Sequence, residues 1–193
     1  MDWNWRATGR CLAGLAGIGV LLWFPFVLGR RVPLLSAADL GFHELGHMLA
    51  IPLGTTAHFL AGSTTQVLVP VGIAAYFWFR QRDHMATGVM LAWAASSAQD
   101  ASVYIADAPY QHLPLIGGHH DWNWLLSHWQ ALSSASTVAR AVWLAGFAAG
   151  IAGVAVCSAP LVVQIRAAMA PRPGPPAGPT DVVVREARYQ QPG

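Results

Sequence analysis

"LGFHELGHMLAIPLG", residues 40–54, sets two histidines and a glutamate inside an otherwise apolar run. In a helix, His43 and His47 lie one turn apart on the same face, so both imidazoles can reach one ion. Glu44 points about 100° away around the helix, where it can approach a metal-bound water without ligating the metal. This H-E-x-x-H spacing is typical of zinc hydrolases, and we interpret it as a Zn²⁺ site with Glu44 as the catalytic base.

The composition indicates that this run lies in a membrane. Hydrophobic residues make up 54% of the 193-residue chain and charged residues 10%, with a mean hydropathy of +0.41. A soluble domain carries roughly 25% charged residues. The net charge of +2 is small and its arginines are scattered, so no basic patch indicates nucleic acid. We therefore predict an integral membrane protein whose partner is the lipid bilayer, with no nucleic-acid partner.

The apolar runs predict an all-α fold, a polytopic membrane protein with about five transmembrane helices. A helix needs about 20 residues to cross the hydrocarbon core. The pattern of Trp122, Leu125, Leu126 and Trp129 adds an interfacial helix. We assign residues 1–170 to a transmembrane metalloprotease-like domain and residues 171–193 to a disordered tail rich in proline and glycine. The five predicted spans cover residues 11–29, 33–52, 64–79, 85–108 and 138–165.

Five crossings would place the N-terminus and the C-terminus on opposite faces of the membrane. The loops at 53–63 and 109–137 would share the face of the N-terminus. More arginines flank the other face, so the positive-inside rule favours an N-terminus outside and a C-terminus inside.

Polar residues inside these spans need a reason, because a charged side chain at mid-membrane costs roughly 2.5–3.5 kcal/mol on insertion scales. A hydrogen-bonded cluster that holds helices together would be one reason, and a metal site is the other. We favour the metal. Asp100 lies about 13 Å from the end of its span and His43 about 13 Å from the end of its own, both towards the same face. Asp100 is therefore our predicted third metal ligand.

The loop "PLIGGHHDWNWLLSHW", residues 114–129, offers a rival ligand in His120. This loop returns on the same face as the site, so His120 could fold down onto the metal. Asp121 either caps the interfacial helix or orients a ligand imidazole from beside the site. We also expect Tyr104 beside the site, because it shares a helix face with Asp100. Asp107 lies one turn further along, and either stands with them or caps the helix end.

Two polar residues near the start of the third span are candidates for binding substrate. Ser63 and Gln66 in "AGSTTQ" lie near the same helix face. They either hydrogen-bond a substrate backbone or cap a helix, and the sequence slightly favours the cap.

The motif "FHELGH" in the second span resembles the site-2-type intramembrane zinc metalloproteases. The fuller pattern, with "AGSTTQVLVP", "QDASVYIADA" and "GGHHDWNWLL", is similar to a group of small bacterial membrane proteins of that broad type. The resemblance spans residues 38 to 130. It implies zinc bound by His43, His47 and Asp100, a bacterial cell membrane location, and hydrolysis of peptide bonds in transmembrane protein substrates. The alternative is a non-catalytic metal-binding or assembly subunit that keeps the protease fold.

Overall fold

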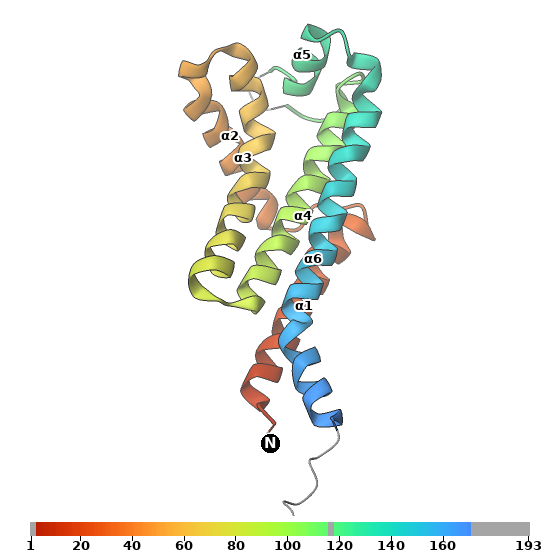
Figure 1. The fold of residues 1–193 in the computed structure, drawn as a ribbon. Helices are drawn as coiled ribbons and strands as arrows, with labels where there is room; N and C mark the ends of the chain where they lie inside the picture. The colour runs from red at the N-terminus through yellow and green to blue at the C-terminus, as the bar shows by residue number, and fades with distance from the viewer. Residues whose placement is uncertain (1–2, 116–117, 171–193) are drawn as a thin grey trace, which may run out of the picture.

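A computed structural model describes residues 3–115 and 118–170, and within these ranges every regular element is a helix. The predicted all-α class is confirmed for this part of the chain. The predicted tail at 171–193 lies outside the described residues. Five long helices form the body, and a short helix, α5, closes one end (Figure 1). The long helices are α1 (Trp5–Phe26), α2 (Leu35–Ala50), α3 (Thr55–Tyr76), α4 (His84–Asp107) and α6 (Ala135–Met169).

Shorter helical segments join the long ones. A 3₁₀ turn, η1 (Ile51–Leu53), ends at Gly54, whose φ of 91° suits glycine and lets α3 begin at Thr55. A π-helical turn, η2 (Phe77–Gln81), extends α3, and η3 (Leu132–Ser134) leads into α6. Helix α5 covers Asp121–His128. Because α3 begins at Thr55 rather than at residue 64, Ser63 and Gln66 lie inside this helix and cap nothing.

Among residues 3–115 and 118–170, three helices, not five, are long and apolar enough to cross a membrane by themselves. They are α1, α3 with its π-helical extension, and the η3–α6 unit. Helix α2 has 16 residues, which span about 24 Å against a hydrocarbon core of roughly 30 Å. Helix α4 has 24 residues, but serines, a glutamine and two aspartates lower its hydropathy. The described part of the chain is thus all-helical and of membrane type, and our count of five complete spans is wrong.

The two ends of the helical body lie together, which contradicts the predicted topology. Asn4 N donates to Gln164 Oε1 at 3.2 Å, and Cys11 Sγ lies 3.2 Å from the carbonyl oxygen of Cys157. In Figure 1, α1 rises from the N-terminus to about mid-height, and α2 then continues in the same direction towards the end that holds α5. We counted these two apolar runs as crossings in opposite directions, but they follow one another in the same direction. The side of the membrane that we predicted for each later segment, relative to the N-terminus, is therefore reversed.

Small residues let the central helices approach closely. A Cβ on Gly88 of α4 would lie 2.6 Å from the carbonyl oxygen of Gly153 in α6, and one on Gly153 would lie 2.7 Å from that of Gly88. Helices associate in membranes largely through such close packing. The resulting α4–α6 pair forms the spine against which α1 and α3 pack.

Helix α5 buries its apolar face in the protein. Trp122, Leu125 and Leu126 are 8%, 0% and 2% exposed and pack with Ile105 of α4 and Ala139 of α6. We predicted this face to contact the membrane, but neighbouring helices provide the apolar surface instead. Docking α5 in this way places its first residue, Asp121, inside the protein.

Candidate metal centre

The two histidines of α2 face α3 as a pair. Their ring centroids are 4.8 Å apart, and His43 is buried. Helix α3 passes directly over them at Gly62, where a Cβ would lie 2.5 Å from His43 Nε2 and 2.6 Å from His47 Nε2. The predicted pairing of these imidazoles on one helix face is confirmed, and only a glycine fits above it.

A carboxylate from α5 completes the group. Asp121 Oδ2 lies 3.0 Å from His43 Nε2 and 3.2 Å from His47 Nε2. Asp121 is 6% exposed. These three side chains form a group of possible metal ligands, with one ligand atom from each lying within 4.8 Å of the others.

The hydrogen bonds behind the rings fix which nitrogen carries the proton. His47 Nδ1 lies 2.7 Å from the carbonyl oxygen of His58, which can only accept, so Nδ1 donates. Gln66 Nε2 faces two acceptors, Ser97 O at 3.3 Å and Asp100 Oδ2 at 3.4 Å. Gln66 Oε1 therefore accepts from His43 Nδ1 at 3.2 Å. In the neutral form of both rings, Nε2 carries the lone pair.

Two imidazole lone pairs and a carboxylate oxygen thus point at one another in a buried space. This arrangement is repulsive unless a cation lies between the three atoms. Tetrahedral coordination at about 2.0–2.1 Å places neighbouring ligand atoms roughly 3.3 Å apart, close to the two observed nitrogen–oxygen distances. Two imidazoles and one carboxylate, with a fourth position open, are also a ligand set of catalytic zinc sites. The residues present therefore fit a divalent metal.

When no metal is bound, protons on the imidazoles can take its place. Doubly protonated imidazoles would donate to Asp121 through Nε2. Burial opposes ionisation of Asp121, but these hydrogen bonds outweigh burial and hold the pKa of its carboxyl at about 2. Asp121 is therefore an anion across the physiological range, ready for either kind of cation.

Comparisons with known proteins add no assignment to this geometry. No protein-family model, curated protein or solved structure matches the chain. The similarity to the site-2-type metalloproteases accordingly rests on the motifs alone, and the site has to be judged by its own atoms.

Asp100, our predicted third ligand, lies outside this group. Its Oδ1 accepts from Arg31 Nε at 2.6 Å, and its Oδ2 accepts from Gln66 Nε2. The structure instead places Asp121, which we predicted beside the site, next to both imidazoles. Depth favoured Asp100, and in the loop that folds back into the bundle we considered His120, rather than Asp121, as the ligand. Asp100 reaches His43 indirectly, through Gln66.

His120, the rival ligand, is also turned away from the imidazole pair. Its ring stacks on Tyr104 with centroids 4.2 Å apart, and its Nδ1 accepts from Asn123 N as the N-cap of α5. Its Nε2 lies 3.5 Å from Asp107 Oδ2. Burial lowers the pKa of His120, which favours the neutral ring. The N-cap role that we considered for Asp121 thus belongs to its neighbour.

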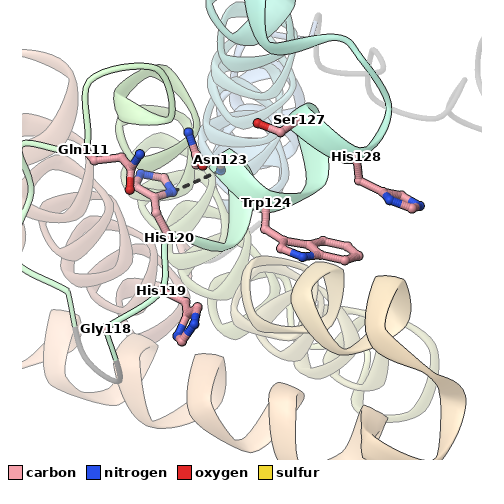
Figure 2. Close-up of a pocket in the computed structure, with 8 residues that line it drawn as sticks. All are labelled: Gln111, Gly118, His119, His120, Asn123, Trp124, Ser127 and His128. Atoms are coloured by element: carbon pink, nitrogen blue, oxygen red, sulfur yellow. Dashed lines mark hydrogen bonds between the residues drawn. The ribbon is translucent and has the colours of Figure 1, made fainter.

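Figure 2 shows this neighbourhood at the outer side of α5. The His120 ring lies beside Asn123, and His119 points the opposite way from the backbone. Together with Trp124 and His128, they line a cavity of about 340 Å³. Trp124 and His128 stack with centroids 4.9 Å apart.

The predicted neighbours Tyr104 and Asp107 do lie close to Asp121 and His120. The Tyr104 hydroxyl accepts from Asp121 N at 3.1 Å and donates to Asp121 Oδ2 at 3.4 Å. Asp107 accepts from His112 N and Leu113 N, which stabilises the loop after α4. Both residues thus hold the segment that delivers Asp121.

Ser63 and Gln66, our substrate-binding candidates, are both buried and both used internally. Ser63 Oγ accepts from Trp122 Nε1 at 3.0 Å, so it anchors α5. Gln66 connects His43 to α4. Ser63 also borders an apolar cavity of about 340 Å³ between α3, α4 and α6, lined largely by alanines and larger aliphatic side chains.

Glu44 is half-buried and sits next to the ligands in α2. It lies near enough to His47 and Tyr104 for its charge to act on both. The residues that the structure describes give Glu44 no hydrogen-bond partner. Its carboxylate is therefore not committed to holding a protein group.

Three residues of the site were missed in the sequence. His58 binds His47 twice, through its carbonyl oxygen and through Nδ1, which donates to His47 O at 3.0 Å. Gly62 makes room for the rings, and Arg31 pairs with Asp100. A histidine eleven residues after His47 was a visible signal for His58, whereas Gly62 and Arg31 had none, because their roles depend on how α3 and the α1–α2 linker pack.

Proposed function

We propose that this chain is an intramembrane zinc metalloprotease that hydrolyses peptide bonds of membrane proteins. The observation that carries the proposal is the convergence of His43 Nε2 and His47 Nε2 on Asp121 Oδ2 within a buried space. The donor set favours zinc, because two imidazoles and a carboxylate leave a fourth position for water.

A bound Zn²⁺ would polarise a carbonyl and lower the pKa of a bound water towards 7. The chain supplies the remaining chemistry. His43, His47 and Asp121 hold the ion, and the hydrogen bonds to His58 and Gln66 orient the rings. Glu44 takes up a proton at its carboxylate and returns it to the leaving amine. A site with no catalytic role would gain nothing from an uncommitted carboxylate at this position.

Several features support a membrane-embedded protein substrate. Helices α3 and α6 are long and apolar enough to span a bilayer, and an apolar cavity lies between α3, α4 and α6. One of its lining residues, Ser63, follows Gly62 in α3. The resemblance of "FHELGH" to site-2-type proteases supports the peptide bond as the target and a bacterial cell membrane as the location. The alternative, a metal-binding assembly subunit, predicts the same metal without turnover.

Metal content tests the site. We expect one zinc per chain in detergent-purified protein, and its loss in His43→Ala and His47→Ala. His84→Ala is the matched control, because His84 packs on Trp78 at the other end of α4. Zinc retained in the His43→Ala/His47→Ala double variant, measured by elemental analysis, would exclude this site.

Turnover tests the activity. Glu44→Gln should keep its zinc and abolish cleavage, because the amide cannot take up the proton. The assay compares cells that express wild type with cells that express Glu44→Gln, and scores membrane-protein fragments by mass spectrometry. Fragments that depend on Glu44 support the protease. A zinc-loaded protein whose fragment pattern is the same in both would support the assembly-subunit alternative.

A further inference from the structure

A chain of hydrogen bonds leads from the imidazole pair to the linker between α1 and α2. His43 Nδ1 donates to Gln66 Oε1 at 3.2 Å, and Gln66 Nε2 donates to Asp100 Oδ2 at 3.4 Å. Arg31 Nε then donates to Asp100 Oδ1 at 2.6 Å. The chain thus joins α2, α3, α4 and the linker, although its four residues are spread over 70 positions of the sequence.

The Arg31–Asp100 pair, at the end of the chain furthest from His43, determines which group donates in each hydrogen bond. Arg31 occupies Oδ1 of Asp100, so Oδ2 faces Gln66, and two acceptors then require the amide nitrogen of Gln66 on that side. Its oxygen must consequently face His43. Gln66 is 4% exposed, so water cannot substitute for a lost partner. A reversed amide would leave buried groups unpaired, which is costly.

We propose that Arg31 and Asp100 are positioning residues that act through Gln66 to keep the His43 proton on Nδ1, so that its Nε2 faces His47 and Asp121. This inference rests on the proposed metal function. His47 needs no such help, because a main-chain carbonyl fixes its Nδ1 proton. His43 depends on side chains alone, so residues far from the metal centre can weaken its ligation.

A charge in this chain strengthens the hold on His43. Hydrogen bonds to an ionised group are stronger than neutral ones, and bonds in a chain polarise one another. The amide N–H that faces Asp100 makes Gln66 Oε1 a better acceptor for the imidazole proton. Partners of this kind typically change metal affinity by about 10–100-fold when they are replaced.

Asp100→Asn is the most informative single variant. Arg31 would hold the asparagine oxygen, and the asparagine NH₂ would face Gln66. Gln66 would then face a donor at position 100 and an acceptor, Ser97 O, on the same side, so its amide would lose its single favoured orientation. The reversed orientation, with the NH₂ towards His43, moves the imidazole proton to Nε2. We expect zinc affinity, measured by chelator competition in detergent, to fall by roughly 10–100-fold. Gln66→Leu should lower zinc affinity by a similar factor. Arg31→Ala should lower it less, because the Arg31–Asp100 ion pair is more exposed to solvent than Gln66 is.

The double variant Gln66→Glu/Asp100→Asn separates positioning from simple damage. Its glutamate can accept from His43 and from the asparagine NH₂, so the order of donors is restored and affinity should recover towards wild type. If each substitution only damaged the structure, the two losses of zinc affinity would instead add in the double variant. Arg30→Ala is the control for Arg31→Ala, since Arg30 precedes it and forms no ion pair in the described part of the chain.

The imidazole protons give a direct signature. In Co²⁺-loaded wild type, the Nδ1 protons of His43 and His47 should appear as two shifted, exchangeable ¹H resonances. In Gln66→Leu, one should change its chemical shift because its hydrogen-bond acceptor is lost, while the other keeps its position. Arg31→Ala leaves the buried core intact, so it tests the chain of hydrogen bonds even if Gln66→Leu fails to fold.

The outcomes are separable. Wild type that binds no metal would overturn the proposed function and this inference with it. Wild type that binds zinc, with unchanged affinity in Asp100→Asn and Arg31→Ala, would overturn the positioning role alone. The positioning role would equally fail if the double variant were as weak as the sum of its single variants.

Discussion

At the scale of single residues, the candidate metal centre depends on a glycine, because any side chain at that position would clash with the imidazoles. Gly62 leaves the space that the two Nε2 atoms need, and a Cβ there would come within 2.6 Å of both. We expect Gly62→Ala to push α3 off α2 and to abolish zinc binding. Gly72→Ala in the same helix, where a Cβ meets nothing within 4 Å, should bind zinc as wild type does. Equal zinc content in the two purified variants would contradict the geometry.

Asp121 is the second residue-scale test. Asp121→Ala removes one of the three proposed ligands and leaves two imidazoles, so zinc affinity should fall by more than the roughly 10–100-fold expected for residues behind the ligands. The comparison is with Asp107→Ala, an aspartate that caps the neighbouring loop and contacts His120. Asp107→Ala should cost less affinity than Asp121→Ala in the same chelator assay. The reverse order would remove Asp121 from the ligand set.

The pH dependence of zinc binding identifies the competing protons. Protons and metal compete for Nε2 of both imidazoles, so affinity should fall as pH is lowered from 8 to 5. Asp121 adds nothing in this window, because its pKa of about 2 keeps it ionised until far lower pH. A plot of log Kd against pH should therefore rise towards low pH. A flat plot would argue against imidazole ligation.

The residues that sequence reasoning identified are those whose geometry is local. The spacing of His43 and His47 determines their shared face before any tertiary contact forms. The third partner is not local: Asp121 lies 78 positions from His43, and its place depends on the docking of α5. Asp100 was a reasonable expectation on depth, yet Arg31, distant in sequence, satisfies its charge instead.

At the scale of elements, α5 delivers Asp121, and Ser63 holds α5 in place. Trp122 Nε1 donates to Ser63 Oγ inside the core. Ser63→Ala leaves that N–H buried without a partner, which costs about 1–3 kcal/mol. We expect a lower thermal midpoint and weaker zinc binding together. Thr64→Ala is the control, because Thr64 is exposed and its hydroxyl only donates to Leu60 O in its own helix. Unchanged values in Ser63→Ala would show that α5 docks by apolar contacts alone.

Element boundaries were harder to predict than element types. Each of the five apolar runs does contain a long helix, because length and hydropathy suffice to indicate one. Helix α3 nevertheless begins at Thr55, since Gly54 ends the preceding turn and the polar start of α3 packs on α2 rather than standing in a loop. The amphipathic pattern of α5 was visible too, but a pattern does not reveal whether lipid or protein covers the apolar face.

At the scale of the whole molecule, the failed topology has one cause. The prediction treated every apolar run as a complete crossing, whereas α1 and α2 run one after the other along the molecule (Figure 1). Helix α6 shows the opposite departure: its 35 residues extend about 52 Å, far more than a hydrocarbon core of roughly 30 Å. Lengths of apolar runs therefore do not map one to one onto membrane crossings in this chain.

The arrangement predicts which parts of the chain share a side of the membrane. The start of α1 and the end of α6 lie together, while α5 lies at the far end of the molecule. Single cysteines introduced by Arg6→Cys and Ala168→Cys should react with a membrane-impermeant maleimide from the same side of sealed vesicles. Ser127→Cys, in α5, should react only from the other side. Both native cysteines are buried, so the unaltered protein serves as the unlabelled control. Labelling of Arg6→Cys and Ser127→Cys from one side would restore the five-crossing topology and contradict the fold described here.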